Sequence, residues 1–525
     1  MTQTTGHHHL LRGPLFSLRD AGGRTTADLP GVLARLGAGA DLEFVALRPH
    51  QAHPWHAFLV QLGALVCART DDRDLARPAD AWRDALLGLA VDDAWCLVVD
   101  DVAKPAFMQV PVPGGEWPRY KPAAETPDDL DMLVTAKNID VKQHSMVAAR
   151  PEHWVYALVT LQTFQGYSGR GNYGVARMNS GFGSRPGLAA APGLGWAERF
   201  ARDVRVWLDG RDELLDPGYE YADGGHALLW TLDWNGKEPR VPLTACDPFF
   251  IEVCRRVRLV DGGGKVGAYA APSDSAFLDA KERLGDTGDV WTPVRATPSG
   301  PAALTVSPGG LTYRLLQDVL FGADWKRQPA LRVHEEDGNH PVVVAQVMVR
   351  GQGKTEGYHE RRIPVPEKGV GWLRSLEERP RLGDFAKARV ERVGDVQKRI
   401  LKPALCALLQ GAPEDLNFRD DRPQPWLDRF DREVDAVFFI DLWRDFGLVV
   451  DERPEAAAAN WEKRLYRLAK AQLDDAFRAA PVPEARDYRA VAVAGMLFEG
   501  AARKHLRQLF AQDEGTADDR TATDA

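Results

Sequence analysis

The stretch GYSGRGNYGVARMNSGFGSRPG, residues 166–187, decides between two fold classes. Its segment Gly169-Arg170-Gly171-Asn172-Tyr173-Gly174 matches G-x-G-x-x-G, the fingerprint of dinucleotide-binding folds. That fingerprint requires a strand before its first glycine and a helix starting at its last one. Here a helix is predicted before it, over Pro151–Phe164, and glycines at positions 181, 183 and 187 would break a helix after it. We therefore predict that this loop does not belong to a Rossmann fold.

The composition of the same stretch suits contact with a phosphate or a nucleic-acid groove. Positions 161–190 hold no acidic residue and no lysine, but three arginines: Arg170, Arg177 and Arg185. Glycines let a backbone approach a ligand closely, and backbone N–H groups act with arginine in phosphate contacts. Tyr167 and Tyr173 can stack or wedge. The alternative interpretation is a plain flexible surface loop.

Length and charge bound the possible classes of protein. With 525 residues, 44% hydrophobic and 27% charged, the chain is predicted to be globular and to have two or more domains. No apolar run reaches the roughly 18 residues that span a bilayer, and MTQTTGHHHLLRG has no signal-peptide pattern, so we expect a cytoplasmic protein without a membrane partner. The net charge of −9 argues against coating nucleic acid with the whole surface, although local basic loops remain possible.

Metal and catalytic signatures are missing from the sequence. The five cysteines form no C-x-x-C pair, which disfavours zinc sites and disulfide frameworks. His50, His53 and His56 recur at intervals of three, but Pro54 between them argues against one regular helix that carries all three. Motifs such as G-x-S-x-G and H-E-x-x-H are absent. We expect no metal, no cofactor and no enzyme activity.

The first 370 residues mix short strands, helices and Gly/Pro-rich connections. Strands are predicted at 44–47, 96–99, 227–232 and 342–349, where bulky or β-branched residues lie between breakers. Helices are predicted over Pro54–Cys67 and Pro151–Phe164, each opening with proline. Because strands and helices do not alternate regularly, we predict an α+β domain over residues 1–370.

From about residue 380, long helical patterns replace the mixture of short strands, helices and connections. Apolar stripes at helical spacing begin near Val434, Trp461 and Val491, and another helical segment runs over Asp384–Gln410, with a kink predicted at Pro403. We predict a C-terminal four-helix bundle over residues 371–512. The acidic residues 513–525 are predicted to be a disordered tail.

A second glycine-rich segment, VMVRGQGKTEGYHERRIPV at 347–365, reads as a β-hairpin. Its tip, Gly351-Gln352-Gly353-Lys354, would present Gln352 and Lys354, with three arginines at its base: Arg350, Arg361 and Arg362. A phosphate-binding loop G-x-x-x-x-G-K-[ST] would require glycine where the chain has Met348. An NTPase site is therefore disfavoured.

Taken in order, these features resemble the CasA-like large subunit of the type I-E CRISPR Cascade complex. The resemblance covers most of the chain and rests on order and spacing rather than on one motif. The similar elements are FSLRDAGGRTTADLPGVLARL (16–36), Pro105-Ala106-Phe107-Met108-Gln109 with one inserted alanine, Lys142-Gln143-His144-Ser145-Met146, the glycine stretch, Ala245-Cys246-Asp247-Pro248, Trp291-Thr292-Pro293, Glu360-Arg361-Arg362 and the C-terminal helices.

The resemblance implies a subunit that is not an enzyme. Such a subunit recognises the protospacer-adjacent motif (PAM) in double-stranded DNA, largely from the minor groove, helps open the duplex into an R-loop, and recruits the helicase-nuclease. The implied partners are double-stranded target DNA, the CRISPR guide RNA, the backbone, handle-binding and small subunits of the complex, and the type I helicase-nuclease.

The resemblance also assigns roles to residues by position. The family's glycine loop falls on Gly169, Arg170, Gly171, Asn172, Tyr173 and Gly174. Its lysine finger corresponds to Lys281, with Lys265 as second choice. Its glutamine wedge falls at the hairpin tip, on Gln352 and Lys354, and its guide-RNA contact on Gln143 and His144. The chain lacks the asparagine that often precedes the histidine of this contact, and the cysteine pairs that bind zinc in some members.

Two other hypotheses remain open at this stage. The loop Gly169–Gly174 could serve a nucleotide-using enzyme, which titration with NAD, FAD or ATP would reveal. Alternatively, the chain could be an assembly scaffold with no DNA role, in which the C-terminal helices supply a docking surface.

Overall fold

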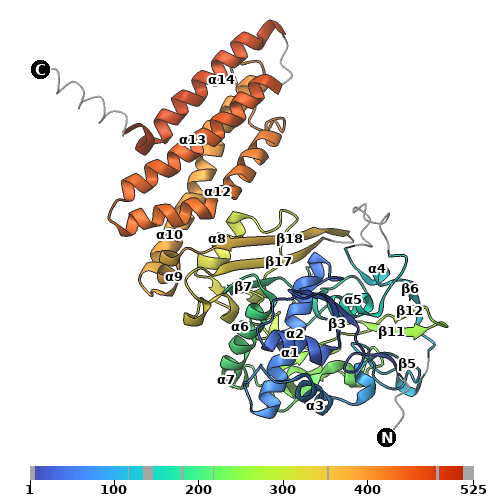
Figure 1. The fold of residues 1–525 in the computed structure, drawn as a ribbon. Helices are drawn as coiled ribbons and strands as arrows, with labels where there is room; N and C mark the ends of the chain where they lie inside the picture. Colours follow the sequence, from blue (N-terminus) through green and yellow to red (C-terminus); the bar gives the residue numbers. More distant parts are fainter. Residues whose placement is uncertain are drawn as a thin grey trace, which may run out of the picture. The chain divides into compact units, whose positions relative to one another are not determined.

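Figure 1 shows the fold in a computed structural model, which describes residues 6–115, 117–133, 146–178, 183–216, 218–351, 354–479 and 484–511. The chain divides into two compact units. The first runs to Leu311 and resumes over Ala323–Pro364, and the second combines Thr312–Gly322 with the chain from Val365 onward. The predicted α+β class with a helical C-terminal region is confirmed.

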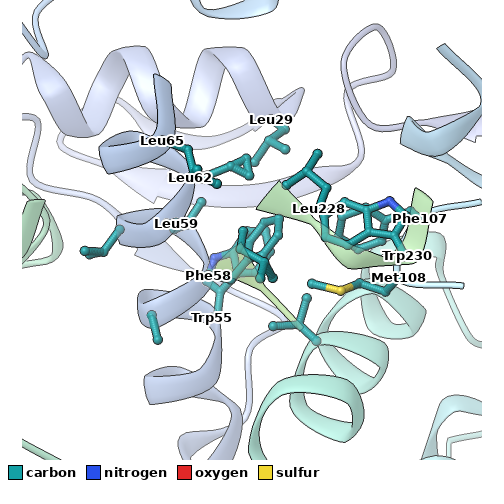
Figure 2. Packing of buried hydrophobic residues seen from close by; sticks show 14 of the residues in the cluster. Leu29, Trp55, Phe58, Leu59, Leu62, Leu65, Phe107, Met108, Leu228 and Trp230 are labelled. Atoms are coloured by element: carbon teal, nitrogen blue, oxygen red, sulfur yellow. The ribbon is translucent and has the colours of Figure 1, made fainter. Parts of the chain in front are cut away.

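The first unit is built around helix α2 (Pro49–Thr70), which is buried along most of its length. Trp55 stacks on Phe58 at a centroid distance of 5.3 Å, and Phe58 meets Phe107 edge-on at 5.6 Å. Trp230 closes the cluster against Phe107, as Figure 2 shows. A helix that is buried on all sides, as α2 is over most of its length, must be surrounded by other elements. The core therefore forms around it.

Six further helices belong to this unit in the described part of the chain. They are α1 (Leu29–Gly37), α3 (Ala79–Leu89), α4 (Pro127–Leu130), α5 (Pro151–Phe164), α6 (Trp196–Asp209) and α7 (Arg211–Leu215). The helix predicted over Pro151–Phe164 is α5, with the predicted bounds. Helices α5 and α6 both pack against α2.

Small sheets, mostly antiparallel, surround these helices. Their strands are β1 (Gly6–His9) with β5 (Cys96–Val99); β2 (Phe16–Asp20) between β3 (Gly23–Ala27) and β4 (Glu43–Phe44); β12 (Val266–Ala271) between β11 (Arg256–Asp261) and β6 (Lys121–Ala124); β14 (Val294–Thr297) between β15 (Gly300–Ala303) and β16 (Trp325–Lys326); β17 (Val342–Gly351) between β18 (Lys354–Pro364) and β7 (Gly187–Ala191); and the parallel pairs β8 (His226–Leu228) with β10 (Cys246–Ile251) and β9 (Val241–Pro242) with β13 (Leu278–Asp279). The strands predicted at 96–99 and 342–349 are confirmed as β5 and most of β17. The one predicted at 227–232 ends at Leu228, where a 3-10 turn begins.

One prediction about the histidines is wrong. His50, His53 and His56 all lie inside α2, which continues through Pro54. Proline costs a helix one hydrogen bond, but the extensive burial of α2 offsets that cost. His50 contacts Asp131 at 2.6 Å and His56 contacts Asp203 at 2.9 Å. All three are therefore core residues. His50 and His56 have carboxylate partners, whereas the Nε2 of His53 is buried without a hydrogen-bond partner among the described residues.

The described residues hold no group of three or more His, Cys, Asp or Glu side chains placed to bind a metal ion. All five cysteines are buried free thiols. No helix within the described ranges is both long and apolar enough to span a bilayer.

The second unit is helical where the structure describes it. Its helices are α8 (Tyr313–Phe321), α9 (Glu367–Arg374), α10 (Glu378–Val396), α11 (Lys402–Leu409), α12 (Gln424–Val450), α13 (Pro454–Ala479) and α14 (Glu484–His505). A π-helical turn, Gln397–Leu401, joins α10 to α11 just before Pro403, where a kink was expected. Helix α12 packs along α13, which Figure 1 shows, and α11 packs along α14. The closed four-helix bundle stays a prediction, and residues 513–525 lie outside the described residues.

Helix α8 joins this unit from the middle of the chain. Tyr313 donates its hydroxyl to Asp431 at 2.9 Å, and Arg314 pairs with the same carboxylate at 2.8 Å. Nothing in the local sequence pattern indicated that this short helix would leave the first unit.

A buried ion pair lies at the end of the connection from α5 to β7, just before β7 begins. Arg185 binds Asp289 through two hydrogen bonds of 2.6 and 2.7 Å, and its guanidinium lies over Phe164 and Trp291. Thr292 donates its hydroxyl to the same carboxylate at 2.7 Å. Removing one partner of such a pair leaves an uncompensated buried charge.

We predict that Asp289→Asn lowers the free energy of unfolding by roughly 3–5 kcal/mol at neutral pH, because Arg185 loses its counter-charge. The exposed pair Arg295–Asp324 provides the control, since Asp324→Asn should cost less than about 1 kcal/mol. Urea denaturation followed by tryptophan fluorescence measures both.

The same pair has a defined pH dependence. Burial alone would raise the pKa of Asp289, but Arg185, Arg177 and the Thr292 hydroxyl together outweigh it and lower the pKa to about 2. The unfolded carboxyl titrates near 3.9, so the pair stabilises the fold fully above about pH 4 and loses its effect as the pH falls toward 2. The stability difference between wild type and Asp289→Asn should narrow over that interval, and a constant difference would contradict this account.

Candidate functional site

The glycine stretch forms the connection between α5 and β7. The amide of Arg185 donates to the carbonyl of Phe164 at 2.9 Å, so the two ends of the connection meet. A helix precedes Gly169, and turns rather than a helix follow Gly174. The prediction that this is not a dinucleotide-binding fingerprint is confirmed.

Residues 168–174 form a compact turn whose glycines allow positive φ angles and close backbone contacts. Gly169 and Gly171 have φ of 106° and 87°, and the amides of Ser168 and Asn172 bond within the turn at 2.9 Å. A Cβ on Gly171 would come within 2.8 Å of Pro272, and one on Gly174 within 2.4 Å of the Gly166 backbone. Space is open only at Gly169, beside the exposed Arg170 and close to the exposed Asn172. The turn therefore presents a fixed tip.

The three arginines of the stretch have two different roles. Arg177 is buried, binds Glu252 at 2.7 Å and lies over Phe250, and Arg185 is paired with Asp289. The composition of the stretch suited a phosphate or groove contact, but Arg177 and Arg185 each compensate a buried carboxylate instead. Arg170 is exposed and makes no ion pair with any residue that the structure describes.

Lys281 lies at the same place as the glycine turn. It begins a 3-10 turn, Lys281–Arg283, and with Tyr173 and Gly174 it lines one cavity of about 500 Å³. Two hydrogen bonds join the glycine turn to the chain segment that precedes Lys281. The Ser273 amide donates to the carbonyl of Gly171 at 3.0 Å, and the Tyr173 hydroxyl donates to the carbonyl of Asp274 at 3.0 Å. Residues more than one hundred positions apart in the chain thus share one surface.

The second-choice lysine lies elsewhere. Lys265 is at the turn between β11 and β12, pairs with Glu125 at 3.3 Å and does not line the cavity. Of the two lysines, only Lys281 is placed with the glycine turn.

The predicted hairpin is β17 with β18, which pair from Val342–Pro364 to Gly351–Lys354. Gln352 lies outside the described residues, and Lys354 is the first residue of β18. At the base of the hairpin, Glu360 accepts hydrogen bonds from Tyr358 and Arg362, at 2.9 and 2.5 Å. The hairpin is thus formed as predicted.

Arg350 connects this hairpin to the glycine turn, which the sequence did not reveal. Its guanidinium donates to Gln165 at 3.2 Å and to the Ser168 hydroxyl at 3.3 Å. Arg255 donates to the carbonyl of Gly166 at 2.8 Å, and Gly166 is the residue after Gln165. Both arginines are buried, at 8% and 7% exposure, and neither has a carboxylate partner among the described residues. Burial, together with the charge of Arg255, lowers the pKa of Arg350 to about 10.

Gln143 and His144, the expected guide-RNA contacts, lie outside the described residues. The flanking chain is fixed on both sides. Thr355 of β18 donates its hydroxyl to the carbonyl of Met132 at 2.8 Å, and the amide of Met146 donates to Asp128 at 2.7 Å. Met132, which precedes that segment in the chain, thus lies next to the hairpin.

Comparison with known proteins identifies the fold. Neither a scan against protein-family models nor a search of curated proteins gives a match. Solved structures do match along nearly the whole chain. Cse1 from Acidimicrobium ferrooxidans has a TM-score of 0.65 at 16% identity, over 96% of this chain and 99% of its own.

Two further solved structures agree. CasA from Thermus thermophilus has a TM-score of 0.63 at 16% identity, over 95% of this chain and 99% of its own. Cse1 from Thermobifida fusca has a TM-score of 0.65 at 14% identity, over 97% of this chain and all of its own. The chain thus has the Cse1/CasA fold, and the resemblance inferred from the sequence is confirmed at that level.

We predict that Arg350→Met leaves the free energy of unfolding within about 1 kcal/mol of wild type, because relief of an uncompensated buried charge offsets the lost hydrogen bonds. The same change at Arg185 is the matched control, and it should cost roughly 3–5 kcal/mol because Asp289 loses its partner. Urea denaturation of the two variants compares them directly. A loss at position 350 as large as at 185 would show that Arg350 has a counter-charge in the folded chain.

Proposed function

We propose that the chain is the large subunit of a type I-E CRISPR RNA-guided surveillance complex and recognises the PAM in double-stranded target DNA. The observation that supports this most is that the glycine stretch, through Tyr173 and Gly174, and Lys281 line one cavity, on a Cse1/CasA fold. The two elements come from distant parts of the sequence, and both match the positions assigned by the resemblance.

The surface has the chemistry of a groove contact. Its cations without an ion-pair partner among the described residues are Lys281 and, on the adjoining turn, Arg170, whereas Arg240 in the same lining pairs with Asp279. Open space at Gly169 lets the backbone approach a ligand closely. Arginine, lysine and backbone N–H groups bind phosphates and sugar edges, and the degenerate minor-groove pattern suits a reader that tolerates several motifs. On a chain of net charge −9, two cations give weak, local and salt-sensitive binding. Assembly with other subunits would supply the rest of the affinity.

Duplex opening is assigned to the β17–β18 hairpin. In this proposal Gln352 and Lys354 at its tip enter the duplex next to the motif, and Arg350 holds the hairpin in register with the glycine turn. Unstacking one base step costs a few kcal/mol, and guide pairing follows in near balance with the displaced duplex. The chain itself performs no catalysis.

The remaining roles concern assembly. Gln143 and His144 would contact the guide RNA, the helical second unit would meet the other Cascade subunits, and the open complex would recruit the helicase-nuclease. The complex would act in the cytoplasm in antiviral defence.

Charge changes at the shared surface test the proposal. We predict that Arg170→Glu and Lys281→Ala each weaken binding of the assembled complex to duplex DNA with a cognate flanking motif by about tenfold. Each should also reduce the slope of log Kobs against log salt by about 1 per lost phosphate contact. Gly171→Ala should weaken binding too, since φ of 87° and the Pro272 contact disfavour a side chain.

Arg24→Glu is the matched control, because Arg24 is an exposed arginine on the β3 strand, away from this surface. It should leave affinity and salt slope unchanged. If the alanine variants of Lys281, Gln352 and Lys354 assemble normally and bind DNA like wild type, the chain is instead a scaffold with no DNA role.

A further inference from the structure

The cavity behind the glycine turn is larger than a groove contact requires. Its volume of about 500 Å³ lies within the roughly 300–1,000 Å³ of small-molecule sites. A backbone turn and a lysine that only touch a groove need a convex or flat surface. A concave site of this size has room for a small molecule.

The walls of the cavity are apolar and aromatic. Tyr167 and Tyr173 stand on one side, with ring centroids 6.0 Å apart and planes inclined at 59°. The remaining apolar lining comes from both chain segments: Val175, Ala176, Met178, Ala276, Leu278, Ala280 and Leu284. At this distance the two tyrosine rings contact each other and form one aromatic wall, against which a planar ring can lie. The site therefore fits a flat, mostly apolar group.

The polar groups of the cavity are mainly cationic and few. Lys281 has no ion-pair partner among the residues that the structure describes. Arg240 pairs with Asp279 at 2.6 Å, but its Nε is buried without a hydrogen-bond acceptor. The one carboxylate in the lining, Asp274, is neutralised by Arg119 through two hydrogen bonds of 3.2 Å. The ligand should thus carry an anion or acceptor beside its planar group.

We propose that this cavity binds a nucleotide, with its base against Tyr167 and Tyr173 and its phosphate at Lys281. Base–tyrosine stacking tolerates any base, and lysine is a common point-charge partner for phosphate. The nucleotide has two possible sources, a free mononucleotide or one nucleotide turned out of a bound DNA strand. The second source rests on the proposed function, whereas the first does not.

Cavity-filling variants test the site in the full-length chain. Ala276→Phe and Ala176→Leu place bulk into the cavity from its two chain segments, while Ala296→Phe adds the same bulk at an exposed position of β14 outside the lining. Thermal unfolding of each variant alone verifies the fold. Two filling variants are used because either one could fail to fold, and the other then still tests the site.

The first arm titrates dAMP, deoxyadenosine and inorganic phosphate by calorimetry. Wild type and Ala296→Phe should bind dAMP saturably, the filling variants at least about tenfold more weakly, and Lys281→Ala should lose the preference for dAMP over deoxyadenosine. The second arm places 2-aminopurine at successive positions in and beside the flanking motif of duplex DNA bound to the assembled complex. One position should change in fluorescence with wild type and not with the filling variants.

The outcomes separate the two proposals. Binding of dAMP without a 2-aminopurine change identifies a free nucleotide as the ligand, and a 2-aminopurine change that the filling variants abolish identifies a base from DNA. If dAMP does not bind, or binds equally to the filling variants, and no 2-aminopurine position responds to them, the inference is overturned even where motif-dependent DNA binding persists. If the wild-type chain binds dAMP but DNA binding by the assembled complex does not depend on the flanking motif, only the proposed function is overturned.

Discussion

Two buried ion pairs, Arg177–Glu252 and Arg185–Asp289, are the interactions on which the candidate site depends. Charges taken out of water must be compensated, so each arginine fixes the position of a carboxylate that is 75 or 104 residues away in sequence. Together the pairs hold the two arms of the glycine stretch against the core of the first unit. The short turn around Gly169, which lies between the two arms, is therefore the part of the stretch that is exposed to solvent.

Asp289 also ties the glycine stretch to the segment that carries Lys281. The two segments meet again at Gly171 and Ser273, so the turn, the lysine and the cavity between them form one preorganised surface. Preorganisation lowers the entropy lost on binding, which matters for a site with few cations. Buried cations without carboxylate partners among the described residues, Arg255 and Arg350, lie directly behind it.

Much of the fold could be predicted from local sequence patterns. Helix α5, strand β5 and the β17–β18 hairpin appear where periodicity and breakers indicated them. Helix α2 extends past Pro54 because burial outweighed a local rule, and α8 joins the helical unit through contacts over 117 and 118 residues that no local pattern encodes.

The candidate site was predictable in part. The glycine turn and Lys281 were identified by the order of elements, and they do share a surface. Composition could not separate Arg170 from the buried Arg177 and Arg185, because only the position of distant carboxylates distinguishes them. Arg255 was missed for the same reason, although arginine inside the apolar run around Val257 was a usable signal. Arg350 was expected at the base of the hairpin, but its contact with the glycine turn was not.

The central claim is that this chain gives a guide-RNA complex its preference for a motif beside the target. The most direct measurement compares the assembled complex with and without this chain on a library of target duplexes whose flanking bases are randomised, with sequencing of the bound fraction. The account predicts enrichment of a small set of flanking motifs that disappears when the chain is omitted. Target binding that ignores the flanking bases in both cases would contradict it.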